Sequence, residues 1–395
     1  MSDYLYVVIY LDNNATTPVD PRVLEKMLPF FTEHYGNAAS RTHQAGWYAE
    51  AAVEAARERV AELLGCEKQE IIFTSGSTEA INIALKGIAK AYESKGKHII
   101  TSRTEHKAVL DVCAALENDG YEISFLDVDR EGCVDAVQLR TLIRKDTIVV
   151  AVMLANNETG TIQDIAALSE ITHANGSLFF SDTTQAAGKI RMDVNELGID
   201  VCCISAHKFG GPKAVGALFI RRKNPRVTLL PWMHGGGHER GLRPGTLNVP
   251  GSAGLGAAAE IALNEMWETN ERISKLRTFT EQFLTEDNLD RSSIERGYIN
   301  GCIKSRLPNT SNILLKGIKA HELIKRVPNI AISTGSACTS ADDAPSHVLR
   351  AMGLSEEEAR ACIRISIGKQ NTEEELLVSR QALRNAIDEL QSRTQ

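Results

Sequence analysis

The chain has 395 residues, of which 43% are hydrophobic and 24% charged, and its formal net charge is −7. This composition excludes a disordered or fibrous protein, and the charge gives no sign of a nucleic-acid-binding surface. No apolar run reaches the length of a membrane span. We therefore expect a cytoplasmic globular protein without a membrane partner or direct nucleic-acid binding.

Taken in chain order, short apolar runs alternate with helical patterns. Residues 1–11 carry an apolar patch without the basic residues or cleavage site of a signal peptide, and they predict a strand. Buried strands are predicted at 70–74, 98–101, 147–154, 178–181, 201–205 and 215–220. Helices are predicted at 78–92, 107–116 and 165–174. Strands that alternate with helices indicate an α/β fold with a mostly parallel central sheet, covered on both faces.

The pattern changes after about residue 251. A long helix is predicted at 253–284, strands at 310–315 and 330–333, and a final helix at 372–391. This α+β stretch predicts a second, smaller domain built from both chain ends. We expect a large domain over residues 15–260 and a small domain formed by residues 1–14 and 261–395.

A lysine and an aspartate follow two of the predicted strands. Lys208 precedes a Gly-Gly-Pro turn, where an apolar pocket can desolvate its amine and prepare it to form a Schiff base. Asp182 comes at a strand end, the place where open α/β sheets bind ligands. A carboxylate paired with a protonated pyridine nitrogen is typical of pyridoxal phosphate sites. Singly, each residue also fits an ordinary role, as a surface lysine or a helix cap.

Three other strand ends carry polar residues. Gly76, Ser77 and Thr78 lie at a turn from strand to helix, where backbone N–H groups and hydroxyls can hold a phosphate. His106 can stack on a planar ring and shuttle protons. Asn157 can bind a phenolate or a carboxylate through its amide. The alternatives are a helix cap, a structural histidine and a polar turn.

Eight cysteines are scattered singly, without a CxxC pair or zinc spacing, and we expect most of them to be small buried hydrophobic residues. Cys338 differs because small and polar residues surround it, which predicts an exposed and reactive thiol on a loop. Together these residues supply an imine-forming lysine, a partner for a ring nitrogen, a phosphate cup and a thiol.

This combination closely resembles the cysteine desulfurases of the NifS/IscS type, which belong to the fold-type I, class V aminotransferase superfamily. The resemblance covers nearly the whole chain. It is carried by the segments 11–18 (LDNNATTP), 74–79 (TSGSTE), 105–106 (EH), 156–160 (NNETG), 205–208 (SAHK), 235–241 (GGGHERG), 245–246 (GT), 335–340 (GSACTS) and 364–366 (RIS).

The resemblance implies pyridoxal 5′-phosphate as the cofactor. Lys208 would form the aldimine, His106 would stack on the ring and act as an acid–base group, and Asp182 would pair with the ring nitrogen. Gln185 would bind the phenolic oxygen. The residues expected around the phosphate are Gly76, Ser77, Thr78, Ser205 and His207, with Thr246 reaching the phosphate of the partner subunit in a homodimer.

The resemblance also implies L-cysteine as the substrate and L-alanine as the product. Asn13, Asn157 and Arg364 would bind the substrate, and Cys338 would hold its sulfur as a persulfide for transfer to an acceptor protein. The acceptor stays open between iron–sulfur cluster assembly, tRNA thiolation and DNA phosphorothioation. The alternatives are a selenocysteine lyase, another class V enzyme, and a catalytically silent partner that keeps the fold.

Overall fold

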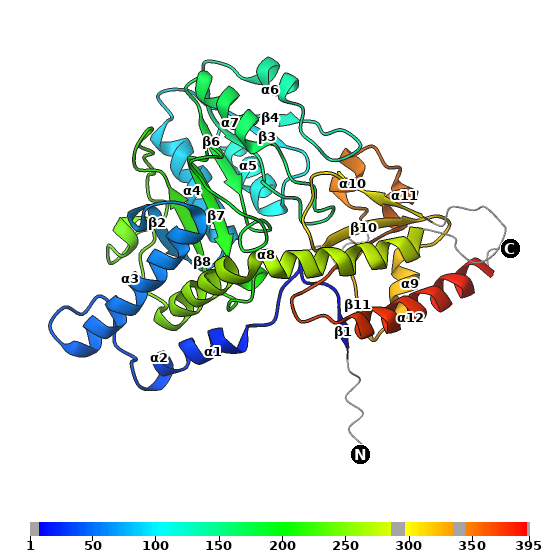
Figure 1. The fold of residues 1–395 in the computed structure, drawn as a ribbon. Coiled ribbons are helices and arrows are strands. Elements are labelled where there is room, and N and C mark those ends of the chain that lie inside the picture. The colour runs from blue at the N-terminus through cyan, green and yellow to red at the C-terminus, as the bar shows by residue number, and fades with distance from the viewer. Residues whose placement is uncertain (1–7, 286–296, 335–343, 393–395) are drawn as a thin grey trace.

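The structure of the protein is a computed structural model that describes residues 8–285, 297–334 and 344–392. A large layered α/β region lies beside a smaller lobe with its own sheet, and the long helix α8 (Val249–Thr285) runs along both (Figure 1). Within the described ranges, no helix combines the length and apolar character needed to cross a bilayer.

The large sheet has seven strands in the order β2-β8-β7-β6-β5-β3-β4. They are β2 (Ile71–Thr74), β3 (His98–Ser102), β4 (Glu122–Leu126), β5 (Thr147–Ala151), β6 (Leu178–Asp182), β7 (Val201–Ser205) and β8 (Gly216–Ile220). Strands β3 to β7 pair in parallel, while β8 runs antiparallel to both of its neighbours. The predicted mostly parallel α/β sheet is confirmed.

Helices cover both faces of this sheet because its strands are apolar on both sides. Successive strand residues point to opposite faces, so Phe179 and Phe180 of β6 belong to different cores. Phe179 packs with residues of α3 (Gln44–Leu64), α7 (Ile165–Ala174) and α8, whereas Phe180 packs with α4 (Ser77–Ala91) and α5 (Lys107–Asn118). Because helices cover both faces of the sheet, a binding site is expected at the strand ends.

The smaller lobe contains an antiparallel sheet in the order β12-β10-β9. Its strands are β9 (Gly297–Asn300), β10 (Thr310–Leu315) and β12 (Cys362–Ser366). Beside it, β1 (Ile9–Tyr10) pairs in parallel with β11 (Ile330–Ala331), which brings the N-terminal segment against the C-terminal third. Leu11, Ile313 and Ile365 share one core with residues of α9 (Ala320–Arg326) and α12 (Glu373–Ser392).

Helix α8 connects the two regions without a break. Val249, Leu255 and Ala259 pack in the core of the large sheet, and Ile273 and Leu276 pack in the core of the smaller lobe. The boundary predicted after residue 260 therefore falls inside one continuous helix, and the division into two domains stays a prediction.

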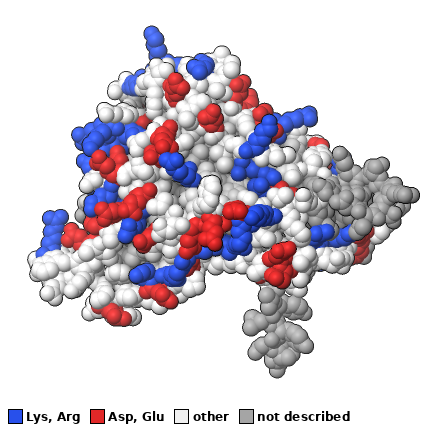
Figure 2. Space-filling model, viewed as in Figure 1, with Lys and Arg blue, Asp and Glu red and all other residues white. Residues whose placement is uncertain are grey.

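Short helices complete the described chain. They are α1 (Pro21–Met27), α2 (Pro29–Thr32), α6 (Ala136–Leu142), α10 (His347–Ala351), α11 (Glu356–Arg360), and the 3-10 turns η1 (Lys68–Glu70), η2 (Ala206–Lys208) and η3 (Glu239–Gly241). On the face shown in Figure 2, basic and acidic side chains are intermixed over the large region.

Candidate active site

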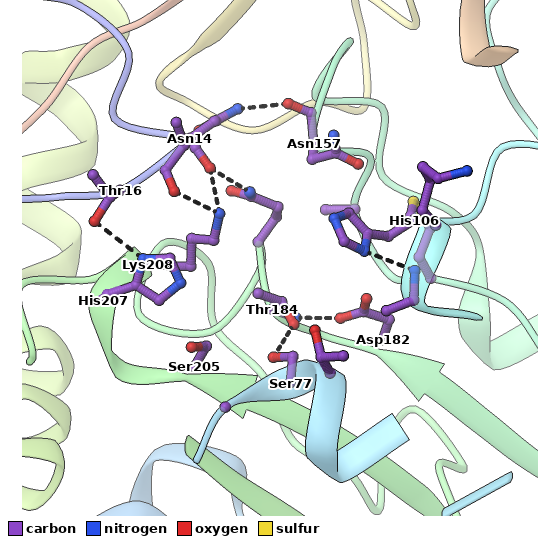
Figure 3. Close-up of a pocket in the computed structure, with 18 of the residues that line it drawn as sticks. Asn14, Thr16, Ser77, His106, Asn157, Asp182, Thr184, Ser205, His207 and Lys208 are labelled. Atoms are coloured by element: carbon purple, nitrogen blue, oxygen red, sulfur yellow. Dashed lines mark hydrogen bonds between the residues drawn. The ribbon is translucent and has the colours of Figure 1, made fainter. Parts of the chain in front are cut away.

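A cavity of about 530 Å³ opens where the carboxyl ends of the parallel strands β3, β5, β6 and β7 meet the smaller lobe. Its polar lining comes from both regions of the chain (Figure 3). The predicted site residues that line it are Gly76, Ser77, Thr78, His106, Asn157, Asp182, Gln185, Ser205, His207, Lys208 and Arg364.

The turn between β2 and α4 forms one end of the cavity. Gly76 precedes the helix with φ 148°, a conformation that favours glycine, and no side chain caps α4 at this position. The N–H groups of the first helical turn therefore remain available for an anion. The hydroxyl of Ser77 lies 2.5 Å from that of Thr184. These donors form a polar cup that suits an anion such as a phosphate.

His207 and Ser205 complete this end of the cavity. Ser205 is the last residue of β7, and His207 lies in the η2 turn that follows, with its Nδ1 3.1 Å from the Thr16 hydroxyl. Burial, with the charges of Lys208 and Lys213, lowers the pKa of His207 to about 4. The imidazole is therefore neutral near pH 7 and offers a hydrogen bond without a charge.

Asp182 is a buried carboxylate that faces the cavity from the end of β6. Its side chain accepts the backbone N–H of Thr184 at 2.9 Å and the thiol of Cys203 at 3.4 Å, both at Oδ1. In the described part of the chain, no ion pair includes Asp182, although the residue is only 6% exposed. A buried carboxylate in this state fits a cationic ligand such as a protonated ring nitrogen.

His106 caps α5 across the cavity from Lys208. Its Nδ1 accepts the N–H of Ala108 at 3.1 Å, which leaves Nε2 as the nitrogen that carries the proton in the neutral ring. Behind it, Glu105 is fully buried, and its Oε1 accepts the N–H of Met153 at 2.8 Å. Burial, reinforced by the charge of Asp182, raises the pKa of Glu105 well above its usual value.

The amine of Lys208 is held at the base of the cavity. Its Nζ donates to the main-chain oxygens of Asn14, at 2.6 Å, and Ala15, at 3.0 Å (Figure 3). Both acceptors belong to the N-terminal segment that crosses under the large region. The lysine therefore lies within the cavity, with its amine bonded to neutral oxygens.

Arg364 reaches the cavity from β12 of the smaller lobe and is 2% exposed. It donates to Asp12 Oδ1 at 2.7 Å and to the main-chain oxygen of Asn157 at 3.1 Å. These bonds fix the guanidinium at the edge of the cavity, a group whose planar shape suits a carboxylate.

Two predicted site residues lie elsewhere. The side chain of Asn13 is buried under the site, where it donates to the Ser366 oxygen at 2.9 Å, and its neighbour Asn14 lines the cavity instead. Thr246 is exposed on a loop and does not line the cavity of its own chain. Cys338 lies outside the described residues.

Sequence reasoning missed several residues at the site. Asn14 and Thr16 line the cavity and belong to the segment 11–18, but no role was assigned to them from the sequence. His347 also lines the cavity, from the start of α10 in the smaller lobe, and its Nε2 lies 3.0 Å from the main-chain oxygen of Glu105. The position of Asn14 in an asparagine-rich segment was the sequence signal that could have identified it as a site residue. No sequence signal pointed to His347.

Residues 9–378 match the family model described as "Aminotransferase class-V". The cysteine desulfurase IscS of Anaeromyxobacter sp. (strain Fw109-5) is 50% identical over 370 residues, which cover 94% of this chain and 90% of that protein. A solved structure described as a NifS-like protein has a TM-score of 0.88 at 39% identity and covers 97% of this chain and 99% of that one. The structure of SspA in complex with cysteine has a TM-score of 0.79 at 33% identity and covers 92% and 100%, respectively.

Proposed function

Because this chain belongs to the class V aminotransferase family and, within it, to the cysteine desulfurases, we propose that it converts L-cysteine to L-alanine and holds the sulfur as a persulfide on Cys338. One observation carries the proposal: the amine of Lys208 and the buried carboxylate of Asp182 face one cavity, which also contains the cup of donors at the start of α4. The solved relative SspA, which was captured with cysteine, supports the choice of substrate.

Pyridoxal 5′-phosphate, on which this family of enzymes depends, fits the groups that the cavity offers. The α4 N-terminus, Ser205 and the neutral His207 would hold its phosphate, and Asp182, which has no ion pair within the described residues, would pair with its ring nitrogen. Gln185 would bind the phenolic oxygen. When bound, the cofactor supplies an electron sink for the Cα of the substrate.

The chain's own residues then bind the substrate and move its protons. Arg364 would hold the carboxylate of cysteine beside Asn157, which fixes the direction in which Cα faces Lys208. Lys208 would take the Cα proton and return one to the product. His106 would donate a hydrogen bond from its Nε2–H to the substrate sulfur, because its Nδ1 is already an acceptor.

Cys338 is the thiol that the proposal assigns to sulfur capture. Its thiolate would attack the substrate sulfur, the C–S bond would break with its electron pair left on the carbon fragment, and that fragment would take a proton and leave as alanine. None of the seven described cysteines lines the cavity. Five of them are buried, as expected, and burial raises the pKa of Cys113, Cys202 and Cys362 to about 12, where thiols are unreactive.

We propose that the active form is a cytoplasmic homodimer. Thr246 is exposed beside Gly245, whose φ is 105°, and in a dimer its hydroxyl would reach the phosphate in the partner's cavity. Cytoplasmic placement is supported by the described cysteines, which are all free thiols, as reducing compartments favour. The persulfide would pass to an acceptor protein in iron–sulfur cluster assembly, tRNA thiolation or DNA phosphorothioation.

One assay tests the proposed function. The purified enzyme is incubated with L-cysteine, alanine and sulfide are measured, and the persulfide is located by mass spectrometry. Alanine release should stop in Cys338→Ser, with cofactor absorption intact, and should persist in the matched control Cys133→Ser. Normal alanine release by Cys338→Ser, or a persulfide on another cysteine, would contradict the assignment.

A further inference from the structure

A second lysine is buried next to the active site. Lys189 is the last residue of the turn that contains Gln185 and is only 9% exposed. Its Nζ donates to two neutral oxygens, Oε1 of Gln185 at 2.6 Å and Oδ1 of Asn14 at 3.1 Å. No ion pair found among the described residues contains it. Burying an ammonium group without a carboxylate is costly, which indicates a function at this position.

The surroundings of Lys189 disfavour the charged form of its amine. Burial, with the charges of Lys208 and Arg364, lowers the pKa of Lys189 well below its usual value. The main-chain oxygen of Lys189 accepts a hydrogen bond from Asn270 of α8 at 2.6 Å, so the backbone is held in place as well. The side chain is therefore fixed against the active-site wall and does not extend toward solvent.

The contact with Lys189 decides which way the Gln185 amide points. An amide group has one oxygen that accepts and one nitrogen that donates two hydrogen bonds. Because Lys189 donates to Oε1, the Gln185 nitrogen lies on the other side, where it donates to the Asn14 main-chain oxygen at 3.0 Å. The reversed amide would lose the bond from Lys189 Nζ and would place its oxygen against the Asn14 main-chain oxygen, where two acceptors would face each other. The second N–H of Gln185 thus stays available to the cavity that Gln185 lines.

Asn14 connects this contact to Lys208. Its side-chain oxygen accepts from Lys189 and from Asn309, at 3.1 and 3.0 Å, which turns its own amide nitrogen toward the Asn157 oxygen at 3.1 Å. Its main-chain oxygen accepts from Gln185 and, at 2.6 Å, from Lys208 (Figure 3). Asn14 therefore accepts hydrogen bonds from both lysines.

We propose that Lys189 is a positioning residue that holds the Gln185 amide with its NH2 group toward the cavity, ready to donate to the phenolic oxygen of the bound cofactor. This inference rests on the proposed function, which supplies the acceptor for Gln185. Lys189 does not itself line the cavity, so its effect passes through Gln185 and Asn14.

A double-mutant cycle tests the proposal on apoenzyme titrated with pyridoxal 5′-phosphate. The measured quantities are the dissociation constant of the cofactor and the position of its visible absorption band. Lys189→Met and Gln185→Met should each raise the dissociation constant about tenfold, as expected for one lost hydrogen bond, and should shift the band in the same direction. The double variant should be no weaker than the weaker single variant, because both changes remove the same contact.

Control variants separate positioning from general destabilisation. Lys189→Arg keeps the donor and should restore the wild-type band. Lys95→Met removes an exposed lysine whose amine donates to the Gly176 oxygen, far along the chain from Gln185, and should leave both readouts unchanged. If Lys189→Met does not fold, Lys189→Gln is used in its place. The glutamine amide can donate or accept, so Lys189→Gln should weaken cofactor binding, whereas Lys189→Arg should not.

The outcomes distinguish the inference from the proposed function. A wild-type dissociation constant and band in Lys189→Met would overturn the inference, as would a double variant whose effects multiply. Failure of the wild-type apoprotein to take up the cofactor would instead overturn the proposed function.

Discussion

Replacing Asp182 with asparagine should weaken cofactor binding and leave the apoprotein at least as stable as the wild type. Asparagine keeps an oxygen for the Thr184 N–H, which Asp182 now accepts at 2.9 Å, so the local geometry can persist. In the apoprotein, the substitution removes a carboxylate that is 6% exposed and, within the described chain, unpaired with any cation. In the holoenzyme, it removes the negative charge that binds the ring nitrogen.

The size of the effect follows from the type of bond that is lost. A hydrogen bond to a charged group contributes about 1.5–3 kcal/mol, which corresponds to cofactor binding about 10 to 150 times weaker. Fluorescence titration of the apoenzyme measures the dissociation constant, and calorimetry measures its melting temperature. Asp127→Asn, in an exposed pair with Arg103, is the matched control and should leave both quantities unchanged. An Asp182→Asn apoprotein that melts earlier but binds the cofactor normally would refute this reasoning.

Three further predictions come from other parts of the structure. Arg57→Met should lower the free energy of unfolding in urea by about 3–5 kcal/mol, because it removes the guanidinium that lies 2.7 Å from the buried carboxylate of Glu239. The control Arg59→Met, in an exposed pair, should lower it by at most about 1 kcal/mol. Equal losses in the two variants would contradict this prediction. The contribution of His207 to the stability of the apoprotein should rise between pH 4 and 6.5, because the unfolded chain binds a proton on His207 that the folded chain, with a pKa of about 4, does not. His207→Gln should flatten this part of the calorimetric pH curve, and an unchanged slope would exclude the assigned cause. Arg364→Lys should raise the KM for cysteine about 10- to 100-fold by losing the two-pronged contact, with cofactor affinity preserved; an unchanged KM would show that Arg364 does not bind the substrate.

The sheet of the large region was predictable because its strands are apolar on both faces and end in polar turns. The predicted spans 165–174 and 201–205 coincide with α7 and β7, and the predicted helix at 253–284 lies within α8. The reversal of β8 was not predictable, since an apolar run carries no sign of strand direction. Helix α3 was missed because alanines form much of its apolar face, and β12 was missed because the buried Arg364 interrupts its apolar pattern.

The residues at the strand ends of the site were predictable, whereas their partners were not. Asp182, Lys208 and His106 follow strands of one parallel sheet, so they meet at one edge. The contact of Lys189 with Gln185 depends on side-chain direction within a turn, and the role of Asn14 depends on a segment that is far from both in sequence. For the same reason, no spacing indicated that the thiols of Cys133 and Cys302 lie within 4.8 Å of each other and of the Glu131 carboxylate.

The most direct test of this account identifies the lysine that binds the cofactor. Borohydride reduction of the holoenzyme followed by peptide mass mapping should place the pyridoxyl group on Lys208, whose amine lies in the cavity that Asp182 faces. A pyridoxyl group on Lys189 or on any other lysine, or no labelled peptide from a protein saturated with pyridoxal 5′-phosphate, would contradict the account.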